Sequence, residues 1–299
     1  MKVSVVLPIY NGEETLEQTL KSLVEQTFQS FELVACIDGT TDRSKEILNA
    51  YAAYFQKVTV LENNNNLGLG PTMNRLIANS NGEYIAVAEQ DDYYYPYRLE
   101  KQVAILNSRN DVGLVSGIAE FWNGNSITGT FPGILVGGKP YPTGRDMFLL
   151  NYRNQIKVVN SCMMFRKSIH IDKGLYFTQH YPSISVDWAY ILRFSLISKI
   201  YGIPEVLVRL DRRTDRKSVT TYKEKQFKAS RELLRSFAYE YPNIISKREY
   251  TYALGTQKIM ELNHTFGFRF VFQSMLYILR NPFDARLRVN LINRFKRKF

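Results

Sequence analysis

The sequence predicts an α/β fold with a mixed, mostly parallel sheet flanked by helices, followed by a helical C-terminal extension. Two observations lead to this prediction. Apolar β-branched runs alternate with helical segments over roughly the first 115 residues, and from about residue 221 the pattern becomes helical. The chain has 299 residues, 45% of them hydrophobic and 22% charged, which excludes disordered and collagen-like classes.

The first part of the chain alternates strand and helix. Val3 to Leu7 and Phe31 to Ile37 are continuous apolar runs, typical of parallel strands that are covered on both faces. A helical segment from about Glu13 to Glu25 joins them into a βαβ unit. The next predicted elements are a helix over 42–55, a strand over 58–61, a loop over 63–71, a helix over 72–79 and a strand over 84–88. Ligands of such sheets bind at the carboxyl ends of the strands.

The middle of the chain is less regular. Strands are predicted over 113–118, 158–165 and 206–210, and the Gly- and Pro-rich stretch from Gly124 to Pro142 predicts a long loop over the site. We expect a domain over 1–220, with a nucleotide-binding half to about 115 and a second half over about 116–220. Residues 221–299 form the predicted basic helical extension.

The positive charge is concentrated in the last third. Residues 1–200 hold 18 Lys and Arg against 19 Asp and Glu, whereas residues 201–299 hold 21 against 9. Nucleic-acid binding is disfavoured, because this region has no recognised motif and no aromatic and basic stacking platform.

Two C-terminal segments, Phe266 to Leu279 and Ala285 to Phe299, combine bulky apolar residues with Arg and Lys. In the second segment Leu287, Leu291, Ile292 and Phe295 can share one side of a helix. Such a helix fits an anionic membrane surface. The alternative is a helix packed on the domain over 1–220, with a solvated basic tail.

Several classes of feature are not predicted. There is no apolar stretch of about 18 residues that would form a transmembrane helix, and the N-terminus lacks a signal-peptide cleavage site. Two cysteines, Cys36 and Cys162, are expected to be reduced and buried, and three scattered histidines give no support for a zinc site. We therefore expect a cytoplasmic protein, peripheral at the inner face of the membrane.

An acidic cluster directly follows the predicted strand over 84–88. Glu89, Asp91 and Asp92 would repel one another at a strand end unless a divalent cation or hydroxyl donors neutralised them. Mg²⁺ or Mn²⁺, held by one or two carboxylates and completed by phosphate oxygens, is one interpretation. A turn of solvated acids, with Asp92 capping a helix, is the other.

A second acid, Asp38, follows the strand that begins at Phe31. A carboxylate there can accept a hydrogen bond from a nucleobase or a ribose. The alternative is a turn with a helix N-cap over 38–42, because Thr and Asp favour such positions.

Six motifs occur in order within residues 1–220. They are SVVLPIYNG at 4–12, IDGTTD at 37–42, NLG at 66–68 with Asn74, GEYI at 82–85, EQDD at 89–92, and Pro96 with RLEKQ at 98–102. This series resembles glycosyltransferase family 2, inverting nucleotide-sugar transferases of the GT-A fold. The resemblance implies a nucleotide-sugar donor, most readily a UDP-sugar, a Mn²⁺ or Mg²⁺ cofactor, and a glycan or lipid-linked saccharide acceptor. It also implies that the half over about 116–220 binds the acceptor.

The resemblance also implies roles for individual residues. Tyr10 would contact the base, Asp38 would hydrogen-bond it and Asp91 would bind the ribose. Asp92 would hold the metal that bridges the two phosphates. The further candidates are Pro8 for the nucleotide, and Glu89 and Asn74 as additional site residues.

The segment from Ser185 to Trp188, with Arg193 after it, resembles the family's motif for the general base. An inverting transfer needs a carboxylate that accepts the proton of the acceptor hydroxyl, and Asp187 would serve. Its alternative role is a helix N-cap. Trp188 would stack on an acceptor sugar or pack in the core.

Three departures from the family pattern stand out. Ile37 and Val186 replace family acids, and the stretch Asp211 to Lys217 lacks a histidine that the family often has. Arg213 lies nearest that position and could neutralise a diphosphate. These departures leave a second hypothesis open, that of a catalytically degenerate nucleotide-sugar-binding or scaffold subunit of a glycan-assembly complex.

Overall fold

The structure is a computed structural model that describes residues 1–132, 135–136, 139–178, 185–213 and 223–289. The chain divides into two compact units. The first comprises Met1–Asn151 with Ile156–Thr221, and the second comprises Tyr152–Gln155 with Tyr222–Phe299.

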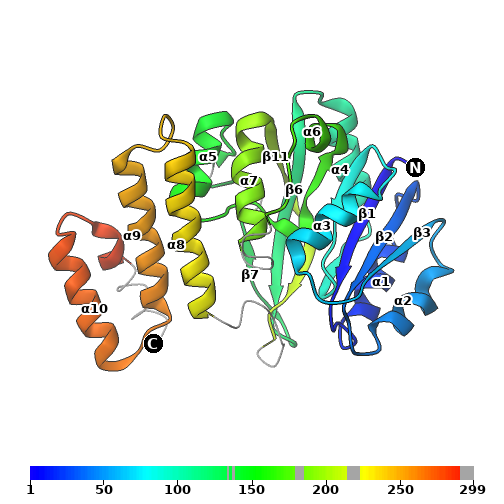
Figure 1. Cartoon of the computed structure of the whole chain (residues 1–299), viewed down its shortest axis with the longest axis horizontal. Helices are drawn as coiled ribbons and strands as arrows, with labels where there is room; N and C mark the ends of the chain where they lie inside the picture. The colour runs from blue at the N-terminus through cyan, green and yellow to red at the C-terminus, as the bar shows by residue number, and fades with distance from the viewer. Residues whose placement is uncertain (133–134, 137–138, 179–184, 214–222, 290–299) are drawn as a thin grey trace. The chain divides into compact units, whose positions relative to one another are not determined.

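A nine-stranded mixed sheet forms the centre of the first unit, in the order β3-β2-β1-β4-β10-β6-β11-β5, with β7 paired to β6 (Figure 1). Its strands are β1 Val3–Ile9, β2 Phe31–Asp38, β3 Val58–Asn63, β4 Tyr84–Val87, β5 Asp92–Tyr94, β6 Val112–Trp122, β7 Ile127–Phe131, β10 Met164–Arg166 and β11 Lys199–Asp211. Two short strands, β8 Leu135–Val136 and β9 Lys139–Pro140, pair separately. The predicted α/β class is confirmed.

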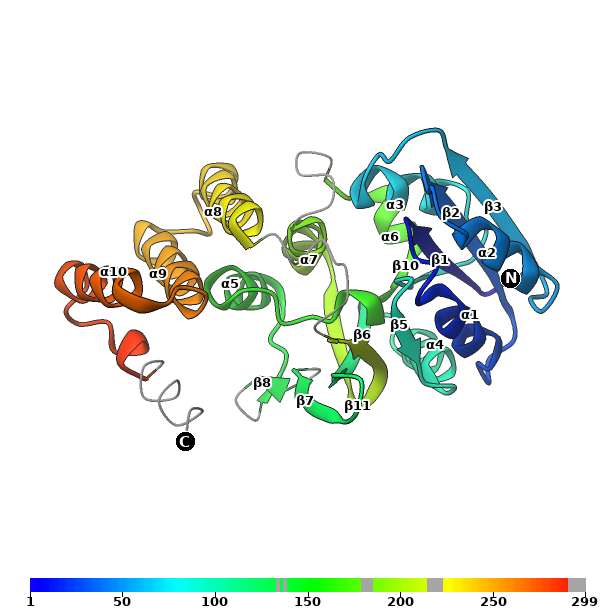
Figure 2. The same ribbon diagram turned by 90° about the horizontal axis from the view of Figure 1, so that it is seen from below.

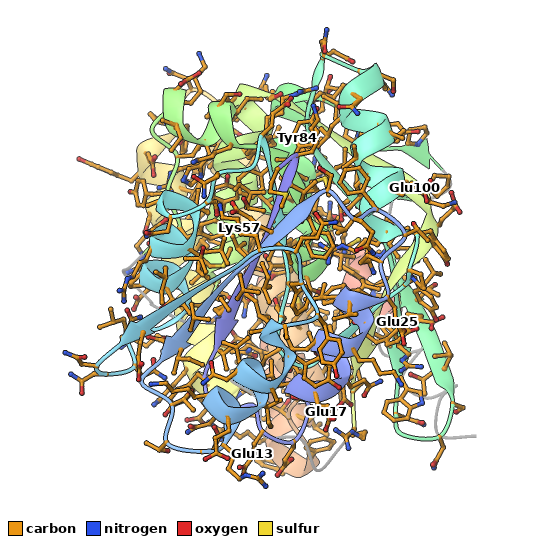
Figure 3. All side chains as sticks on the ribbon, turned by 90° about the vertical axis from the view of Figure 1, so that its right-hand side faces the viewer. Glu13, Glu17, Glu25, Lys57, Tyr84 and Glu100 are labelled. Carbon is orange, nitrogen blue, oxygen red and sulfur yellow. The ribbon has the colours of Figure 1, made fainter. Side chains whose placement is uncertain are left out.

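Four neighbouring strands, β3, β2, β1 and β4, are parallel, so their carboxyl ends meet at one edge of the sheet. Figure 3 shows this polarity: Lys57, just before β3, and Tyr84, at the start of β4, lie toward one end, and Glu13, after the carboxyl end of β1, lies toward the other. Beyond β4, the strand β10 is antiparallel to both of its neighbours, whereas β11 is parallel to β6 and antiparallel to β5.

Helices cover both faces of the sheet (Figure 2). In β1, Val3, Val5 and Leu7 are buried in the cluster that includes side chains of α1, α2 and α4, whereas Val6 is buried in the cluster that includes side chains of α3, α5 and α7. This alternation is the period of two of a strand that is buried on both sides. The helices of this unit are α1 Leu16–Val24, α2 Ser44–Ala52, α3 Leu69–Ala78, α4 Arg98–Ser108, α5 Gly144–Asn154 (whose last residues belong to the second unit), α6 Lys167–Asp172 and α7 Val186–Ile197.

Two predictions about the middle of the chain were wrong. The expected strand over 158–165 is mostly a turn, because Asn160–Cys162 form a 3₁₀ helix before the short β10. The expected loop from Gly124 to Pro142 contains β7, because the side chain of Asn123 accepts hydrogen bonds from the backbone N–H groups of residues 125 and 126 and closes a hairpin with β6. Cys36 and Cys162 are buried and unpaired, as expected.

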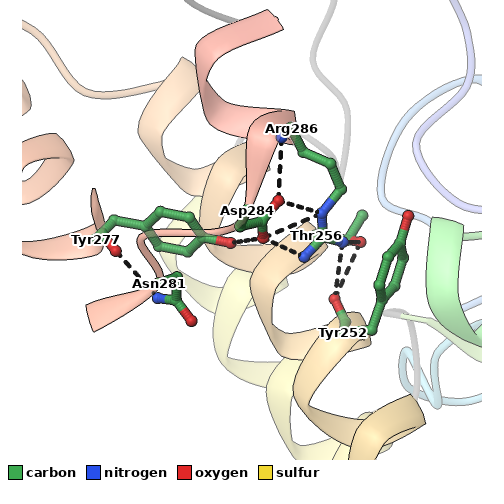
Figure 4. Close-up of polar contacts among 6 residues, drawn as sticks. All are labelled: Tyr252, Thr256, Tyr277, Asn281, Asp284 and Arg286. Carbon is green, nitrogen blue, oxygen red and sulfur yellow. Dashed lines mark hydrogen bonds and ion pairs between the residues drawn. The ribbon is translucent and has the colours of Figure 1, made fainter. Parts of the chain in front are cut away.

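The second unit is helical, as predicted, with α8 Lys223–Glu240, α9 Lys247–Asn263 and α10 Gly267–Arg280. Figure 4 shows how the segment after α10 is fixed to α9. The Asp284 carboxylate accepts hydrogen bonds from the Tyr277 hydroxyl, at 2.6 Å, and from Arg286. Arg286 also donates to the carbonyl of Tyr252, at 3.0 Å, and to the hydroxyl of Thr256, at 2.7 Å. In the ranges that the structure describes, no helix is both long and apolar enough to cross a membrane.

Candidate active site

The acidic cluster lies where β4 leads into β5. Ligand atoms of Glu89, Asp91 and Asp92 lie within 4.8 Å of one another. Asp92 is 3% exposed, and the other two are partly buried. Burial, followed by the charges of Asp91 and Asp187, raises the pKa of Glu89 to about 7. Burial and the two neighbouring acids also raise the pKa of Asp92 well above its usual value. For Glu89 and Asp92, burial and the repulsion between the acids therefore outweigh the stabilising groups around them.

A buried aromatic and cationic pair supports the loop that carries these acids. The backbone N–H of Glu89 donates to the hydroxyl of Tyr94, at 2.6 Å. The Tyr94 ring centre lies 4.4 Å from the guanidinium carbon of Arg98, which is fully buried at the start of α4. Arg98 also donates to the carbonyl of Val87, at 2.6 Å. The Arg98 that opens the RLEKQ motif is thus a positioning residue under the acid loop.

The 3₁₀ turn at 160–162 supplies two polar partners. The Asn160 amide donates to the Glu89 carboxylate, and Ser161 is hydrogen-bonded to the Asp92 carboxylate. Among the residues described by the structure, Asp92 Oδ2 has no hydrogen-bond partner. A buried carboxylate oxygen without a partner, beside two more acids, fits the hard oxygen ligands of Mg²⁺ or Mn²⁺. Asn160 and Ser161 were not predicted as site residues; their one signal in the sequence is a polar pair inside an apolar run.

Gln90 joins the acid loop to the end of β1. Its side chain accepts from the Tyr10 N–H, at 2.8 Å, and donates to the Tyr10 carbonyl, at 2.9 Å. A Cβ at Gly12 would lie 2.6 Å from the Gln90 amide carbon, so a larger residue there would displace the Gln90 side chain from these hydrogen bonds. The Tyr10 side chain itself is 45% exposed, whereas Pro8 is partly buried within β1, opposite Cys36. Tyr10 is therefore the more accessible of these two nucleotide-binding candidates.

Asp38 is buried and holds the loop after β3. Its carboxylate accepts hydrogen bonds from the Asn63 amide, at 2.7 Å, and from the backbone N–H groups of Leu67 and Gly68, at 2.9 and 3.0 Å. Three of its roughly four acceptor positions are used within the protein. The structure thus gives Asp38 a loop-fixing role, and its contact with a base stays a prediction.

Both polar atoms of the Asn74 side chain are hydrogen-bonded within the protein. Its amide donates to the Phe177 carbonyl and accepts from the Phe177 N–H, each at 2.8 Å. A Cβ at Gly70 would lie 2.0 Å from the carbonyl oxygen of Thr178, so α3 packs directly against this backbone. Asn74 holds the segment at 177–178 against α3.

Asp187 lies in the first turn of α7, after Ser185, whose φ is 56°. Burial raises its pKa, although its carboxylate accepts hydrogen bonds from its own N–H and that of Trp188. The effect of Asp187 on the pKa of Glu89 places the base candidate within electrostatic range of the acidic cluster. Trp188 is buried and donates to the carbonyl of Asn151, at 3.0 Å, so it packs in the core.

Two arginines follow β11. Arg213 pairs with Asp211, whose carboxylate lies 2.8 Å from the guanidinium. Burial dominates the pKa of Glu89 and of Asp92, but the charge of Arg212 acts in the opposite direction on both. Arg212 is exposed, and its guanidinium carbon lies 5.4 Å from the ring centre of Phe121. Arg213 was the predicted candidate for the diphosphate, and its neighbour Arg212 was not predicted. The last residues of this run, 214–217, lie outside the described ranges.

The family model for glycosyl transferase family 2 matches residues 4–172. EpsE of Bacillus subtilis, named as a glycosyltransferase, is 31% identical over 184 residues, which are 59% of this chain and 66% of EpsE. WfgD of Escherichia coli is 28% identical over 129 residues, 43% of this chain and 50% of WfgD. It is named UDP-Glc:alpha-D-GlcNAc-diphosphoundecaprenol beta-1,3-glucosyltransferase. The matches thus span less than two thirds of the length of these two relatives.

Solved structures share the fold. Staphylococcus aureus TarS 1–349, in complex with UDP-GlcNAc, superposes with a TM-score of 0.64 at 21% identity, covering 80% of this chain and 67% of that one. The mannosyltransferase PcManGT of Pyrobaculum calidifontis, in complex with GDP-Man and Mn²⁺, gives a TM-score of 0.56 at 13% identity, covering 97% and 85%. These likenesses establish a GT-A fold for this chain.

Proposed function

Because this chain belongs to glycosyltransferase family 2, we propose that it transfers a sugar from a nucleoside-diphosphate sugar, most readily a UDP-sugar, to a glycan or lipid-linked saccharide. The observation that carries the proposal is the acidic cluster at the carboxyl edge of the sheet, with the unpartnered Asp92 Oδ2 and with Asp187 in electrostatic range. The UDP-GlcNAc in the TarS structure and the UDP-Glc and diphosphoundecaprenol in the WfgD name support this donor and acceptor class. A lipid-linked acceptor would place the reaction at the inner face of a membrane.

Asp92, together with Glu89 or Asp91, would hold Mn²⁺ or Mg²⁺. The ion would supply positive charge to the diphosphate of the donor. The Mn²⁺ in the PcManGT structure supports this choice of ion class. Although burial raises the pKa of both Glu89 and Asp92, the charge of the exposed Arg212 acts to lower both. Arg212 would therefore add a second positive charge beside the leaving diphosphate.

Asp187 would act as the general base. Its carboxylate takes the proton of the acceptor hydroxyl, and the freed oxygen attacks the anomeric carbon from the face opposite the nucleotide. The new C–O bond forms as the bond to the phosphate oxygen breaks, and the nucleoside diphosphate leaves with the electron pair, so the anomeric configuration inverts. The raised pKa of Asp187 favours this role, because a base works best when its pKa approaches the working pH.

The nucleotide would lie against the carboxyl ends of β1 and β2. The accessible ring of Tyr10 would stack on the base, with Pro8 behind it in β1. Asp91 would bind the ribose. Asp38 has room for one more hydrogen bond beside the three it makes, and this bond would go to the base.

The first test is thermal unfolding of the wild-type chain with UDP, GDP, dTDP or CMP, each with Mn²⁺ and with a chelator. A ligand at 100 times its Kd stabilises the folded state by about 2.7 kcal/mol. We expect stabilisation by one nucleotide that needs Mn²⁺. Absence of a shift with every nucleotide would contradict the donor site.

The degenerate-subunit hypothesis has a specific basis, because Ile37 and Val186 are buried apolar residues where the family has acids. It predicts Mn²⁺-dependent nucleotide binding without turnover. Release of the nucleoside diphosphate from its sugar, with or without acceptor, distinguishes the two functions: turnover by the wild-type chain excludes the degenerate subunit.

A further inference from the structure

The helix α10 exposes an apolar stripe. Phe268, Val271, Phe272, Met275 and Leu279 recur every three or four residues, so they share one side of the helix. Their exposed fractions are 83%, 60%, 49%, 57% and 68%. Two more exposed phenylalanines stand beside the two ends of the helix, Phe266 and Phe283.

A different side of α10 makes the packing contacts of the second unit. Tyr277 and the partly buried Phe270 pack with Ile259 and Leu262 of α9. The hydrogen bonds of Asp284 and Arg286 fix the end of this helix, as Figure 4 shows. The exposed stripe is therefore additional to the apolar face that folding requires, and contiguous apolar surface of this kind marks an interaction site.

The surroundings of the stripe are positively charged. Arg269, Arg280 and Arg288 are exposed. Asp284, the single acid of the sequence between residues 264 and 299, is already bound by Arg286 and Tyr277. The sequence continues with four further basic residues after residue 289, which lie outside the described ranges.

We propose that α10 lies in the plane of an anionic membrane surface, with the stripe in the acyl boundary and the arginines at the phosphate headgroups. The helix has 14 residues, about 21 Å at 1.5 Å per residue, too short to span a hydrocarbon core of about 30 Å. A second copy fits less well, because joining two stripes would also bring two rows of arginines together. The proposal rests on the proposed function only in that a lipid-linked acceptor would be at the same surface.

The experiment is cosedimentation of the full chain with phosphatidylcholine vesicles, with and without about 30% phosphatidylglycerol. We expect binding that requires the anionic lipid and that falls at least about tenfold in the double variant Phe268→Gln, Phe272→Gln. Each of Arg269→Gln and Arg280→Gln should lower the partition coefficient about fivefold, because a basic residue near the lipid contributes about 1 kcal/mol. Ile171→Gln in α6 and Tyr239→Gln in α8 are matched controls, exposed by 56% and 90%, and should bind like the wild type.

Each variant is also tested for thermal unfolding and for the shift with nucleotide and Mn²⁺. Unchanged values show that a loss of vesicle binding reflects neither misfolding nor failure of the donor site. The proposal is overturned if the wild type does not bind the anionic vesicles or if the stripe variants bind as well as the controls. A dimer in sedimentation analysis that the stripe variants abolish, without vesicle binding, would assign the stripe to a second copy instead.

Discussion

At the two ends of the parallel strands, the pKa values of acidic side chains are shifted in opposite directions. Near the amino end, Glu32 accepts hydrogen bonds from the Ser4 hydroxyl, at 2.7 Å, and the Asn81 N–H, at 2.6 Å, and lies 2.7 Å from the ammonium of Lys57. Burial opposes its ionisation, but Lys57, Ser4 and Asn81 lower its pKa to about 2. Past the carboxyl end, burial and neighbouring acids raise the pKa of Glu89 to about 7.

Burial opposes ionisation in both places, so the neighbours make the difference: a cation and hydrogen-bond donors surround Glu32, whereas other acids surround Glu89. At the amino end the fold supplies every partner that the carboxylate needs. At the carboxyl end it gathers three acids and leaves Asp92 Oδ2 without a partner in the described part of the chain. Perturbed carboxylates of this kind concentrate at functional sites. The comparison predicts that loss of an acid affects stability at one end and turnover at the other.

The largest effect is expected for Asp187→Asn. An amide cannot accept the proton of the acceptor hydroxyl, so kcat should fall by about 10²- to 10⁴-fold. Nucleotide binding with Mn²⁺ should be unchanged in the thermal-shift assay, because the base does not hold the donor. Full transfer activity in this variant would show that Asp187 is not the general base.

Next, Asp92→Asn should abolish the part of the nucleotide-induced thermal shift that depends on Mn²⁺, because an amide is a far weaker metal ligand. The unliganded protein should be no less stable than the wild type, since the change removes a buried carboxylate whose charged form is destabilised by burial and by the neighbouring acids. Titration of Mn²⁺ at fixed UDP measures the first effect, and denaturant unfolding measures the second. A variant that unfolds at a lower denaturant concentration than the wild type and keeps the Mn²⁺-dependent shift would contradict both expectations.

At the opposite end, Glu32→Gln should lower the free energy of unfolding by about 1–3 kcal/mol, because it removes the charge that Lys57, Ser4 and Asn81 stabilise. The Mn²⁺-dependent nucleotide shift should persist. Denaturant unfolding of wild type and variant at pH 7 makes the measurement. Equal stability would show that the polar partners at the amino end contribute little.

A smaller effect is expected on the free energy of unfolding when the pH is changed. The raised pKa of Glu89 means that the folded state binds this proton more tightly than the unfolded state, so its contribution to stability is lost as pH rises from about 4.5 to about 7. Glu32 has the opposite sign, with its contribution present above about pH 4.5 and lost as pH falls toward about 2. In chelator, Glu89→Gln should therefore gain stability relative to wild type between pH 5 and 8. Parallel pH profiles of the variant and the wild type would contradict the raised pKa of Glu89.

Much of this arrangement follows from local sequence. Apolar runs place β1, β2 and β4, and the acids after them fall at one edge because parallel strands share a direction. Whether an acid or an amide has hydrogen-bond partners depends on residues far away in the chain. Asn160 and Ser161, which contact the acids, lie about 70 residues after them, and Phe177, which bonds to Asn74, lies 103 residues after it. Local sequence patterns do not indicate such long-range pairs. It could place Asp38 and Asn74 near a site, but not foresee that their polar atoms are already occupied.

Gln90 restricts which sequences this site can tolerate. Its side-chain oxygen accepts a hydrogen bond from the Tyr10 N–H, and its side-chain nitrogen donates one to the Tyr10 carbonyl. An Asp or a Glu at position 90 could not donate and would place a negative charge against a carbonyl oxygen. An acid is thus disfavoured at position 90, although acids occupy positions 89, 91 and 92 around it.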